Sequence, residues 1–217
     1  LDVNIIGAGG GFSYNVQGIS HNTSEDISVL RSLPNLSIHN PGSRLETEFV
    51  LESMFKSNKP SFARLGKSPD MDFYKKKIND VNDLILTKGS NLTIFTTGNI
   101  LENVYKAVKS LKKDKGYKIK LISLPTLKPT NEKFIIKNIN SPRVLSIEEN
   151  INIGGLGSMI AISIFKYKKN KKIHFKSLSL EDIIHNKIGS QNYLRKINKL
   201  NIENIKKIII KFLSEKY

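Results

Sequence analysis

Short apolar runs alternate along this chain with stretches in which apolar residues recur every three or four positions. Four runs have the length of buried strands, at residues 3–7, 36–39, 61–65 and 92–96. The stretch after the last run has the spacing of one helix face, at Ile100, Val104, Val108 and Leu111. Strands that are separated by helices favour a mainly parallel sheet. The pattern therefore predicts an α/β fold.

Polar residues mark where several of the helices should begin. Thr23 is followed three residues later by Asp26, and Ser43 by Glu46, which is the spacing of a capping box. Asn201 precedes an amphipathic stretch at the end of the sequence and can cap it in the same way. We therefore expect helices to start near each of these three positions.

The periodicity weakens once, and this divides the chain into two α/β units with mainly parallel sheets. Polar residues accumulate at 69–90, which we interpret as a linker between a first unit, residues 1–68, and a compact second unit, residues 91–217. The second unit carries further predicted strands at 118–123 and 144–147. Because the sequence lacks an initiator Met and opens directly on a strand, we expect it to begin inside a domain.

Positive charge is concentrated in the second part of the sequence. The formal net charge is +16, made up of −1 over residues 1–70 and +17 over residues 71–217. Lysines spread over several helix faces favour a solvated surface, and the missing aromatic interleaving argues against nucleic acid. A polyanion-binding surface is the alternative, formed by Lys112, Lys113, Lys115, Lys118, Lys120, Lys168, Lys169, Lys171 and Lys172.

Composition excludes several classes of site. The chain has no Cys, so disulfides and thiolate metal sites are impossible, and its four His are too scattered to predict a metal cluster. The longest apolar runs, at 158–165 and 202–213, are shorter than a membrane span. We therefore expect a soluble, cytoplasmic protein that does not act at a membrane.

Chemistry-bearing residues gather after the first strand. The glycines at 9–11 let the backbone approach a ligand closely, and His21 in the following loop can carry protons near neutral pH. A His in a loop is more often a surface or hydrogen-bonding residue, so the spacing alone leaves catalysis open. Glu25 and Asp26 follow in the same region.

Several motifs follow one another in a recognisable order in the first unit: Gly9 to Tyr14, Gly18-Ile19-Ser20-His21, Glu25 to Asn35, Pro41-Gly42 and Ala63 to Lys67. In this order they resemble the transketolase family. In the family they correspond to the last part of the pyrimidine-binding domain. The resemblance implies that residues 1–68 are the C-terminal part of such a domain.

The second unit resembles the same family. Its matching segments are Ser123 to Pro129, Leu145 to Glu149, Gly154 to Ser158, Gly189 to Gln191 and Tyr193 to Arg195. The resemblance covers almost the whole chain and is to two-subunit transketolase-like proteins with a separate C-terminal subunit. It implies that residues 91–217 form a transketolase C-terminal-type domain.

Residue by residue, the resemblance implies four site positions. His21 would be the catalytic residue that hydrogen bonds or transfers a proton to the substrate oxygen. Arg64 would bind an anionic group of the acceptor, and an Arg that pairs with a carboxylate is the alternative. Ser20 keeps the hydroxyl of a family Thr, and Gln17 replaces a substrate-contacting Asp. Departures from the family at Gln17, Ile19 and Gly9 leave the identity of the substrate open, above all whether it is a sugar phosphate.

Two features of the second unit have competing interpretations. The run Gly154 to Ser158 could cradle a phosphate at a helix start, but glycines that allow tight strand-to-helix packing are favoured. Glu148 and Glu149 look like a pair of catalytic carboxylates, and we favour an interface or structural role for them.

The resemblance also implies an activity. The expected reaction is transfer of a two-carbon ketol unit between sugars or sugar phosphates. The expected cofactors are thiamine diphosphate and Mg²⁺, held mainly by segments absent from this chain, so that no cofactor or metal ligand is predicted here. The expected partner is an N-terminal transketolase subunit or domain, in a homodimer or heterotetramer, and the chain alone would be inactive. The alternatives are another thiamine-dependent enzyme, such as a deoxyxylulose-phosphate synthase or a 2-oxo acid dehydrogenase beta subunit, and a non-catalytic partner subunit or basic binding module.

Overall fold

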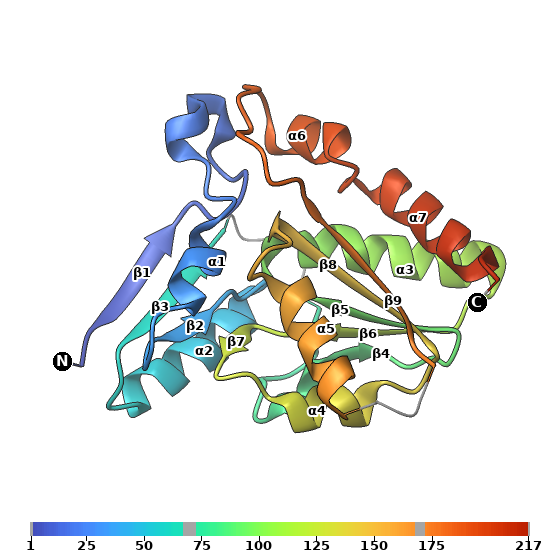
Figure 1. Ribbon diagram of the computed structural model, residues 1–217, viewed down its shortest axis with the longest axis horizontal. Helices are drawn as coiled ribbons and strands as arrows, with labels where there is room; N and C mark the ends of the chain where they lie inside the picture. The colour runs from blue at the N-terminus through green and yellow to red at the C-terminus, as the bar shows by residue number, and fades with distance from the viewer. Residues whose placement is uncertain (1, 67–72, 168–171, 217) are drawn as a thin grey trace.

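Two sheets organise the protein, as Figure 1 shows for the computed structural model, which describes residues 2–66, 73–167 and 172–216. The first sheet has the strand order β1-β3-β2-β7. Its strands are β1 (Asn4–Ala8), β2 (Ser37–His39), β3 (Ser61–Leu65) and β7 (Thr126–Lys128). The first three strands are parallel, and β7 runs antiparallel to β2.

The second sheet is larger and has the strand order β4-β6-β5-β8-β9. Its strands are β4 (Ile85–Thr87), β5 (Leu92–Thr96), β6 (Ile119–Ser123), β8 (Arg143–Ile151) and β9 (His174–Leu180). The four strands from β5 onward are parallel, and only the edge strand β4 is antiparallel to its neighbour. The predicted α/β class with mainly parallel sheets is confirmed.

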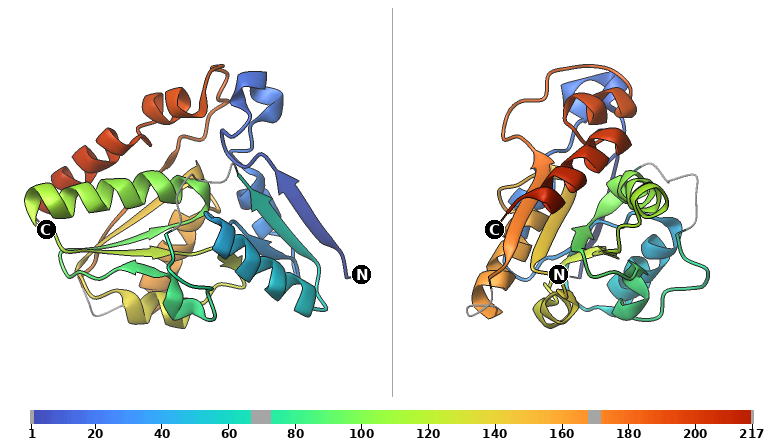
Figure 2. Two further views of the ribbon diagram at one scale, coloured as in Figure 1. Left: turned by 180° about the vertical axis from the view of Figure 1, so that it is seen from behind. Right: turned by 90° about the vertical axis from the view of Figure 1, so that its right-hand side faces the viewer.

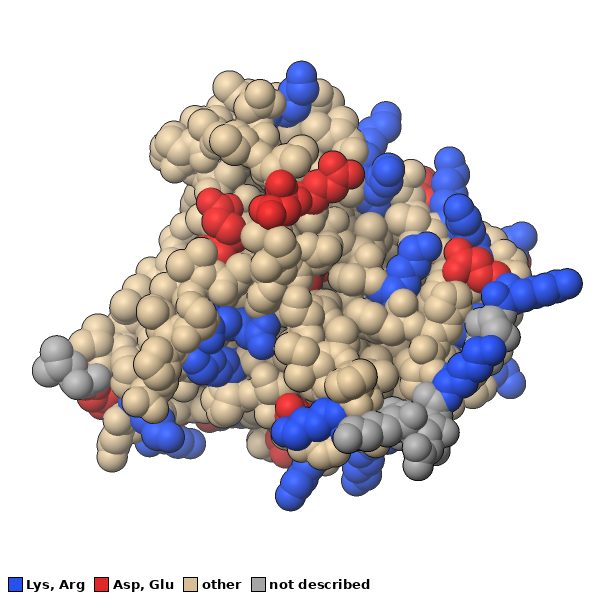
Figure 3. Space-filling view, in the orientation of Figure 1, with Lys and Arg blue, Asp and Glu red and all other residues tan. Residues whose placement is uncertain are grey.

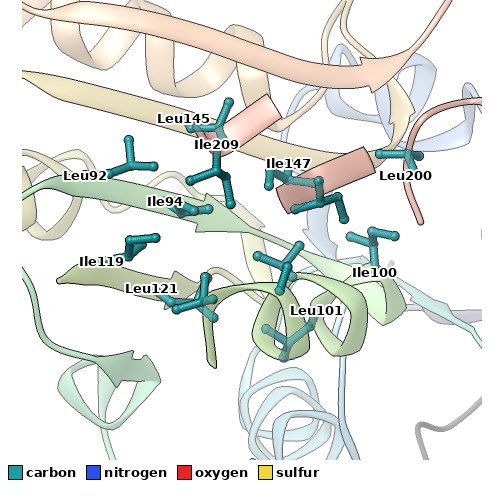
Figure 4. Close-up of a cluster of buried hydrophobic side chains, with 14 of the residues drawn as sticks. Leu92, Ile94, Ile100, Leu101, Ile119, Leu121, Leu145, Ile147, Leu200 and Ile209 are labelled. Carbon is teal, nitrogen blue, oxygen red and sulfur yellow. The ribbon is translucent and has the colours of Figure 1, made fainter. Parts of the chain in front are cut away.

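Helices cover both faces of the second sheet (Figure 2). The helices are α1 (Asp26–Arg31), α2 (Arg44–Lys56), α3 (Leu101–Lys115), α4 (Glu132–Asn138), α5 (Leu156–Tyr167), α6 (Gln191–Ile197) and α7 (Ile202–Ser214). Residues of α3, α6 and α7 form one buried apolar cluster with β5, β6 and β8, and Figure 4 shows several of these side chains facing one another. Residues of α1, α4 and α5 form the cluster on the other side.

That second cluster joins the two sheets. It combines Ile38 and Phe62 of the first sheet with Phe95 and Val144 of the second. Strand β7 adds to this connection, because it lies between two elements of the second sheet in sequence yet pairs with β2. The two predicted units are therefore packed against each other through a shared apolar core, which fixes their relative position.

The second half of the stretch predicted as a linker, residues 69–90, contains regular elements. Residues 81–84 form a 3₁₀ turn, η3, and β4 follows directly as a strand of the second sheet, with Leu84 buried. Ile78 is also buried. Residues 69–72 lie outside the described part of the chain. The short run at 85–87 carries too few alternating positions to signal a strand by itself.

Local capping follows the sequence in two of three predicted places. The Ser43 hydroxyl accepts from the Glu46 N–H at the start of α2, and the Asn201 side chain accepts from the Asn204 N–H at the start of α7. The prediction for Thr23 is wrong, because α1 has Glu25 at its N-cap without a side-chain cap. The Thr23 hydroxyl accepts instead from the backbone of Gly11.

Charged side chains are spread over the surface. On the face that Figure 3 shows, Lys and Arg stand mostly singly, with Asp and Glu among them. Three lysines of the alternative polyanion-binding surface, Lys168, Lys169 and Lys171, lie outside the described residues. Along the described chain, no helix has the combination of length and apolar character needed to cross a bilayer.

Candidate functional site

Residues 11–23 form a closed loop at the end of β1, which we call the His21 loop. The Gly11 N–H donates to the Thr23 hydroxyl over 2.8 Å, and the Thr23 N–H donates to the Gly11 carbonyl over 3.2 Å. Between these ends the chain makes two 3₁₀ turns, η1 (Asn15–Gln17) and η2 (Ile19–His21). Just before it, the Gly9 and Gly10 N–H groups both donate to the Leu65 carbonyl, which ties the loop to the end of β3.

Three of the four predicted site residues lie together on this loop. Gln17, Ser20 and His21 are all exposed there. The Ser20 hydroxyl lies 3.0 Å from Nδ1 of His21, and the direction of this hydrogen bond is set by the His tautomer. The loop thus presents an imidazole, a hydroxyl and an amide to a ligand from one short segment.

Arg64, the fourth predicted residue, is buried beneath the loop and is only 2% exposed. Its Nη1 pairs with Asp26 Oδ1 at 2.9 Å and donates to the Thr23 carbonyl at 3.0 Å. Its Nη2 donates to the Glu149 carbonyl at 3.0 Å, and its Nε to Asn40 Oδ1 at 3.2 Å. Every guanidinium nitrogen is therefore engaged by the protein. This is the arrangement of the alternative prediction, an Arg that pairs with a carboxylate, and binding of a substrate anion by Arg64 stays a prediction.

Glu149, near the end of β8, contacts the base of the His21 loop. Its Oε1 accepts from the Phe12 N–H at 2.9 Å, and its Oε2 accepts from Nε of Arg195 at 2.5 Å. Arg195 lies on α6, so one carboxylate connects the loop, β8 and α6. Both side chains of the ion pair are buried, with exposures of 5% for Arg195 and 1% for Glu149.

Glu148, the neighbouring carboxylate, serves the start of α5. It accepts from the N–H groups of Leu156 and Gly157, each at 2.8 Å. Burial raises the pKa of Glu148 to about 7, against the opposing effect of these two hydrogen bonds. Glu148 and Glu149 thus contact different partners and do not act as one carboxylate pair.

The glycine run at the start of α5 packs tightly, as predicted. A Cβ on Gly155 would lie 2.4 Å from Glu148 Oε2, and a Cβ on Gly157 would lie 2.3 Å from the Ser177 hydroxyl. Because Glu148 occupies the first N–H groups of the helix, they are not available to a phosphate. The packing interpretation of this run is confirmed.

A pH dependence of stability follows from Glu148. Because its pKa rises from 4.5 to about 7 on folding, the folded chain holds a proton that the unfolded chain loses between these values. We expect the free energy of unfolding to fall by roughly 3 kcal/mol as the pH rises from 4.5 to 8. Urea unfolding at several pH values would measure this fall. Glu148→Gln should flatten the curve, and an equally steep curve in that variant would contradict the assignment.

The segment 185–188 also holds the His21 loop, and sequence reasoning did not find it. Asn15 Nδ2 donates to the Lys187 carbonyl at 2.9 Å, and Asn22 Nδ2 donates to the His185 carbonyl at 3.2 Å. The Phe12 ring meets the His185 ring edge-on, with centroids 5.5 Å apart. Figures 1 and 2 show the loop beside the segment that leads into α6. More than 160 residues separate these partners in sequence, and no motif signals the contact.

A cavity of about 320 Å³ opens between the loop and this segment. On the loop side it is lined by Ile19 and Asn22, together with Glu25, which precedes α1. Residues 182–185 line the other side. Ile19, Ile183 and Ile184 are more than half exposed. The cavity beside the loop therefore combines exposed isoleucines with two acidic residues, Glu25 and Asp182.

Comparison with known proteins decides the family. Residues 83–205, more than half of the chain, match the family described as transketolase, C-terminal domain. The chain belongs to the transketolase C-terminal domain family. The match to the transketolase C-terminal domain begins at residue 83, and so includes β4 and most of the elements that follow it.

Curated relatives match more of the chain than residues 83–205. The chain is 28% identical to a subunit of the apulose-4-phosphate transketolase of Phocaeicola vulgatus over 166 residues, 73% of this chain and 52% of that protein. It is 30% identical to 1-deoxy-D-xylulose-5-phosphate synthase of Clostridium beijerinckii over 199 residues, 89% of this chain and 31% of that protein. The chain thus spans about half the length of the first relative and a third of the second.

A solved transketolase structure has the same fold. This structure, described as "Split gene transketolase, inactive beta4 tetramer", aligns with a TM-score of 0.81 and 22% identity, over all of this chain and 68% of that one. Both the resemblance to transketolases inferred from the motifs and the fold class are confirmed. The comparisons do not test the roles of His21, Ser20, Gln17 and Arg64, and these remain predictions.

Proposed function

We propose that this chain is the C-terminal component of a transketolase-like enzyme, which transfers a two-carbon ketol unit between sugar-type substrates together with an N-terminal subunit or domain. The match of residues 83–205 to the transketolase C-terminal domain carries the proposal. The relative from Phocaeicola vulgatus, which is named as one subunit of a transketolase, supports it. The exposed His21 loop supplies a surface on which the chain can act.

Each residue of the loop has a role in this proposal. His21 hydrogen bonds to the substrate oxygen, or transfers a proton to or from it, and Ser20 orients the imidazole through the contact at Nδ1. Gln17 offers its amide to substrate hydroxyls. For Arg64 the geometry favours the alternative role, because its guanidinium holds the loop end at the Thr23 carbonyl.

The cofactors are assigned to the partner. Within residues 2–66, 73–167 and 172–216, no group of three or more His, Asp or Glu is placed to hold a metal ion. In the assembled enzyme we propose that thiamine diphosphate and Mg²⁺ bind mainly to the partner, and that this chain forms the substrate side of a shared site.

A second candidate reaction is the synthesis of 1-deoxy-D-xylulose 5-phosphate. The relative from Clostridium beijerinckii supports it, because its identity of 30% extends over 89% of this chain. The two reactions differ in their products, so an assay that separates ketol exchange between sugars from formation of deoxyxylulose phosphate distinguishes them. The shared loop residues would face the substrate in either reaction.

Reconstitution tests the proposal. We expect the chain alone to be inactive, and a complex of the full chain with its N-terminal counterpart to transfer ketol units only when thiamine diphosphate is added. The matched controls are the counterpart alone and the complex without cofactor. A stable complex that shows neither reaction would point to a non-catalytic partner subunit. Binding of the isolated chain to nucleic acid with a steep salt dependence would favour the basic module instead.

A further inference from the structure

Both ends of the His21 loop are held by buried charged side chains of other elements. At the C-terminal end, Arg64 of β3 donates to the Thr23 carbonyl. At the N-terminal end, Glu149 of β8 accepts from the Phe12 N–H, the first amide after the Gly11 and Thr23 closure. The tip between them carries His21. The direction of the tip therefore depends on how firmly these two ends are fixed.

The contact at Glu149 is unusually close to the loop backbone. Gly11 has φ +64°, in the left-handed region, and a Cβ there would lie 2.2 Å from Glu149 Oε1. The carboxylate thus takes the space that a side chain at residue 11 would need. At this position the glycine-rich turn requires Gly for both its conformation and its packing.

The second oxygen of Glu149 is fixed from the opposite side. Nε of Arg195 donates to it, while Nη2 of Arg195 is buried and has no hydrogen-bond partner among the described residues. The Arg195 side chain is buried, so its charge depends on Glu149 for compensation. Because Arg195 sits on α6, which packs into the cluster formed with α3 and α7, the carboxylate is braced by the rigid core of the second sheet.

We propose that Glu149 is a positioning residue for the loop that carries His21. The effect of Glu149 on catalysis rests on the proposed function, whereas its anchoring of the loop does not. Glu149 accepts from the Phe12 N–H and so holds this end of the loop against β8 and α6. The Phe12 ring contacts the His185 ring. Displacement of this end by about 1 Å would misplace the His21 imidazole relative to the substrate oxygen, and a misplacement of this size can cost about a hundredfold in rate.

Two substitutions separate positioning from a simple ion pair. Glu149→Gln keeps the size of the side chain, but its amide has one oxygen for two donors, so one of the two hydrogen bonds is lost. Glu149→Ala removes both hydrogen bonds. Glu148→Gln is the matched control, because Glu148 is also buried on β8 but contacts the start of α5 instead of the loop.

Hydrogen exchange on the full isolated chain tests the anchoring without any activity. We expect amides within residues 11–23 to exchange at least about tenfold faster in Glu149→Ala than in the parent, with an intermediate effect in Glu149→Gln. In Glu148→Gln the faster amides should lie at the start of α5. Unchanged loop exchange in a folded Glu149 variant would overturn the proposal. If Glu149→Ala does not fold, Glu149→Gln alone decides the question.

Kinetics of the complex test the consequence for His21. We expect Glu149→Ala to lower kcat by roughly tenfold to a hundredfold with little change in KM, and Glu149→Gln to restore part of the loss. In a His21→Ala background the Glu149 substitutions should have no further effect on kcat. Independent, multiplying effects would overturn positioning through His21. A parent complex without activity would contradict the proposed function only, because hydrogen exchange still decides the anchoring.

Discussion

Replacing Arg64 with Ala is expected to lower the free energy of unfolding by about 3 to 5 kcal/mol. The guanidinium is 2% exposed and joins separate elements of the structure through Asp26, the Thr23 and Glu149 carbonyls and Asn40. The variant leaves Asp26, with a side chain only 19% exposed, without its ion pair. Several buried acceptors lose their donor at the same time. Urea unfolding of the isolated chain would measure the loss.

The control for Arg64 is an arginine on the surface. Arg44 pairs with Glu48 one helical turn away, and its side chain is 61% exposed. We expect Arg44→Ala to change stability by no more than about 1 kcal/mol, because exposed ion pairs contribute little. Arg64→Lys keeps the charge but loses the planar fork, and its stability should lie between those of the parent and Arg64→Ala. Similar losses in Arg44→Ala and Arg64→Ala would contradict the buried-hub interpretation.

His21→Ala is expected to lower kcat of the reconstituted complex by about a hundredfold or more. The imidazole is exposed on the loop tip and contacts Ser20, so its removal disturbs no buried packing. We therefore expect the free energy of unfolding of the isolated chain to stay within about 0.5 kcal/mol of that of the parent. Steady-state kinetics and urea unfolding on the same preparations separate the two effects.

A second histidine provides the matched control for His21. His174 begins β9 and pairs in register with Arg143 at the start of β8, whereas the His21 loop contacts the other end of β8, at Glu149. We expect His174→Ala to leave kcat within about a factor of two of the parent. Full activity in His21→Ala would remove the catalytic assignment, and equal losses in both variants would indicate a general effect on assembly.

Much of the fold followed from local sequence signals. Strand β5 spans the predicted residues 92–96, because all five of its residues are buried and form one unbroken apolar-rich run. The face of α3 was found for the same reason, since Val104, Val108 and Leu111 repeat at helical spacing and all are buried. Such signals are strong where a whole run or a whole helix face is covered by the core.

Edge elements were harder to predict. β4 and β7 have three residues each, and β9 is only half-buried along most of its length, so none has a clear pattern of burial. β7 also pairs with a strand that lies more than 80 residues earlier, and this pairing joins the two predicted units into one core. A local pattern contains no information about such a pairing, because the partner strand supplies the hydrogen bonds that define it.

The candidate site, too, could be predicted from the sequence only in part. The motif after the first strand located His21, Ser20 and Gln17, and these residues share one exposed loop. The family resemblance placed Arg64 beside a substrate, yet the structure buries it against Asp26. Asp26 is 38 residues away and Glu149 is 85, so the burial of the guanidinium depends on how the two sheets pack.

The sequence by itself determined the α/β class, the transketolase likeness and the loop that carries His21, because short-range periodicity and ordered motifs encode all three. Only the tertiary structure decided that Glu149 contacts the loop from 137 residues away, and that Glu148 binds the start of α5. The physical reason is that a carboxylate's role depends on which donors reach it inside a low-dielectric interior. Glu148 and Glu149 are adjacent and have the same side chain, yet they have different hydrogen-bond partners.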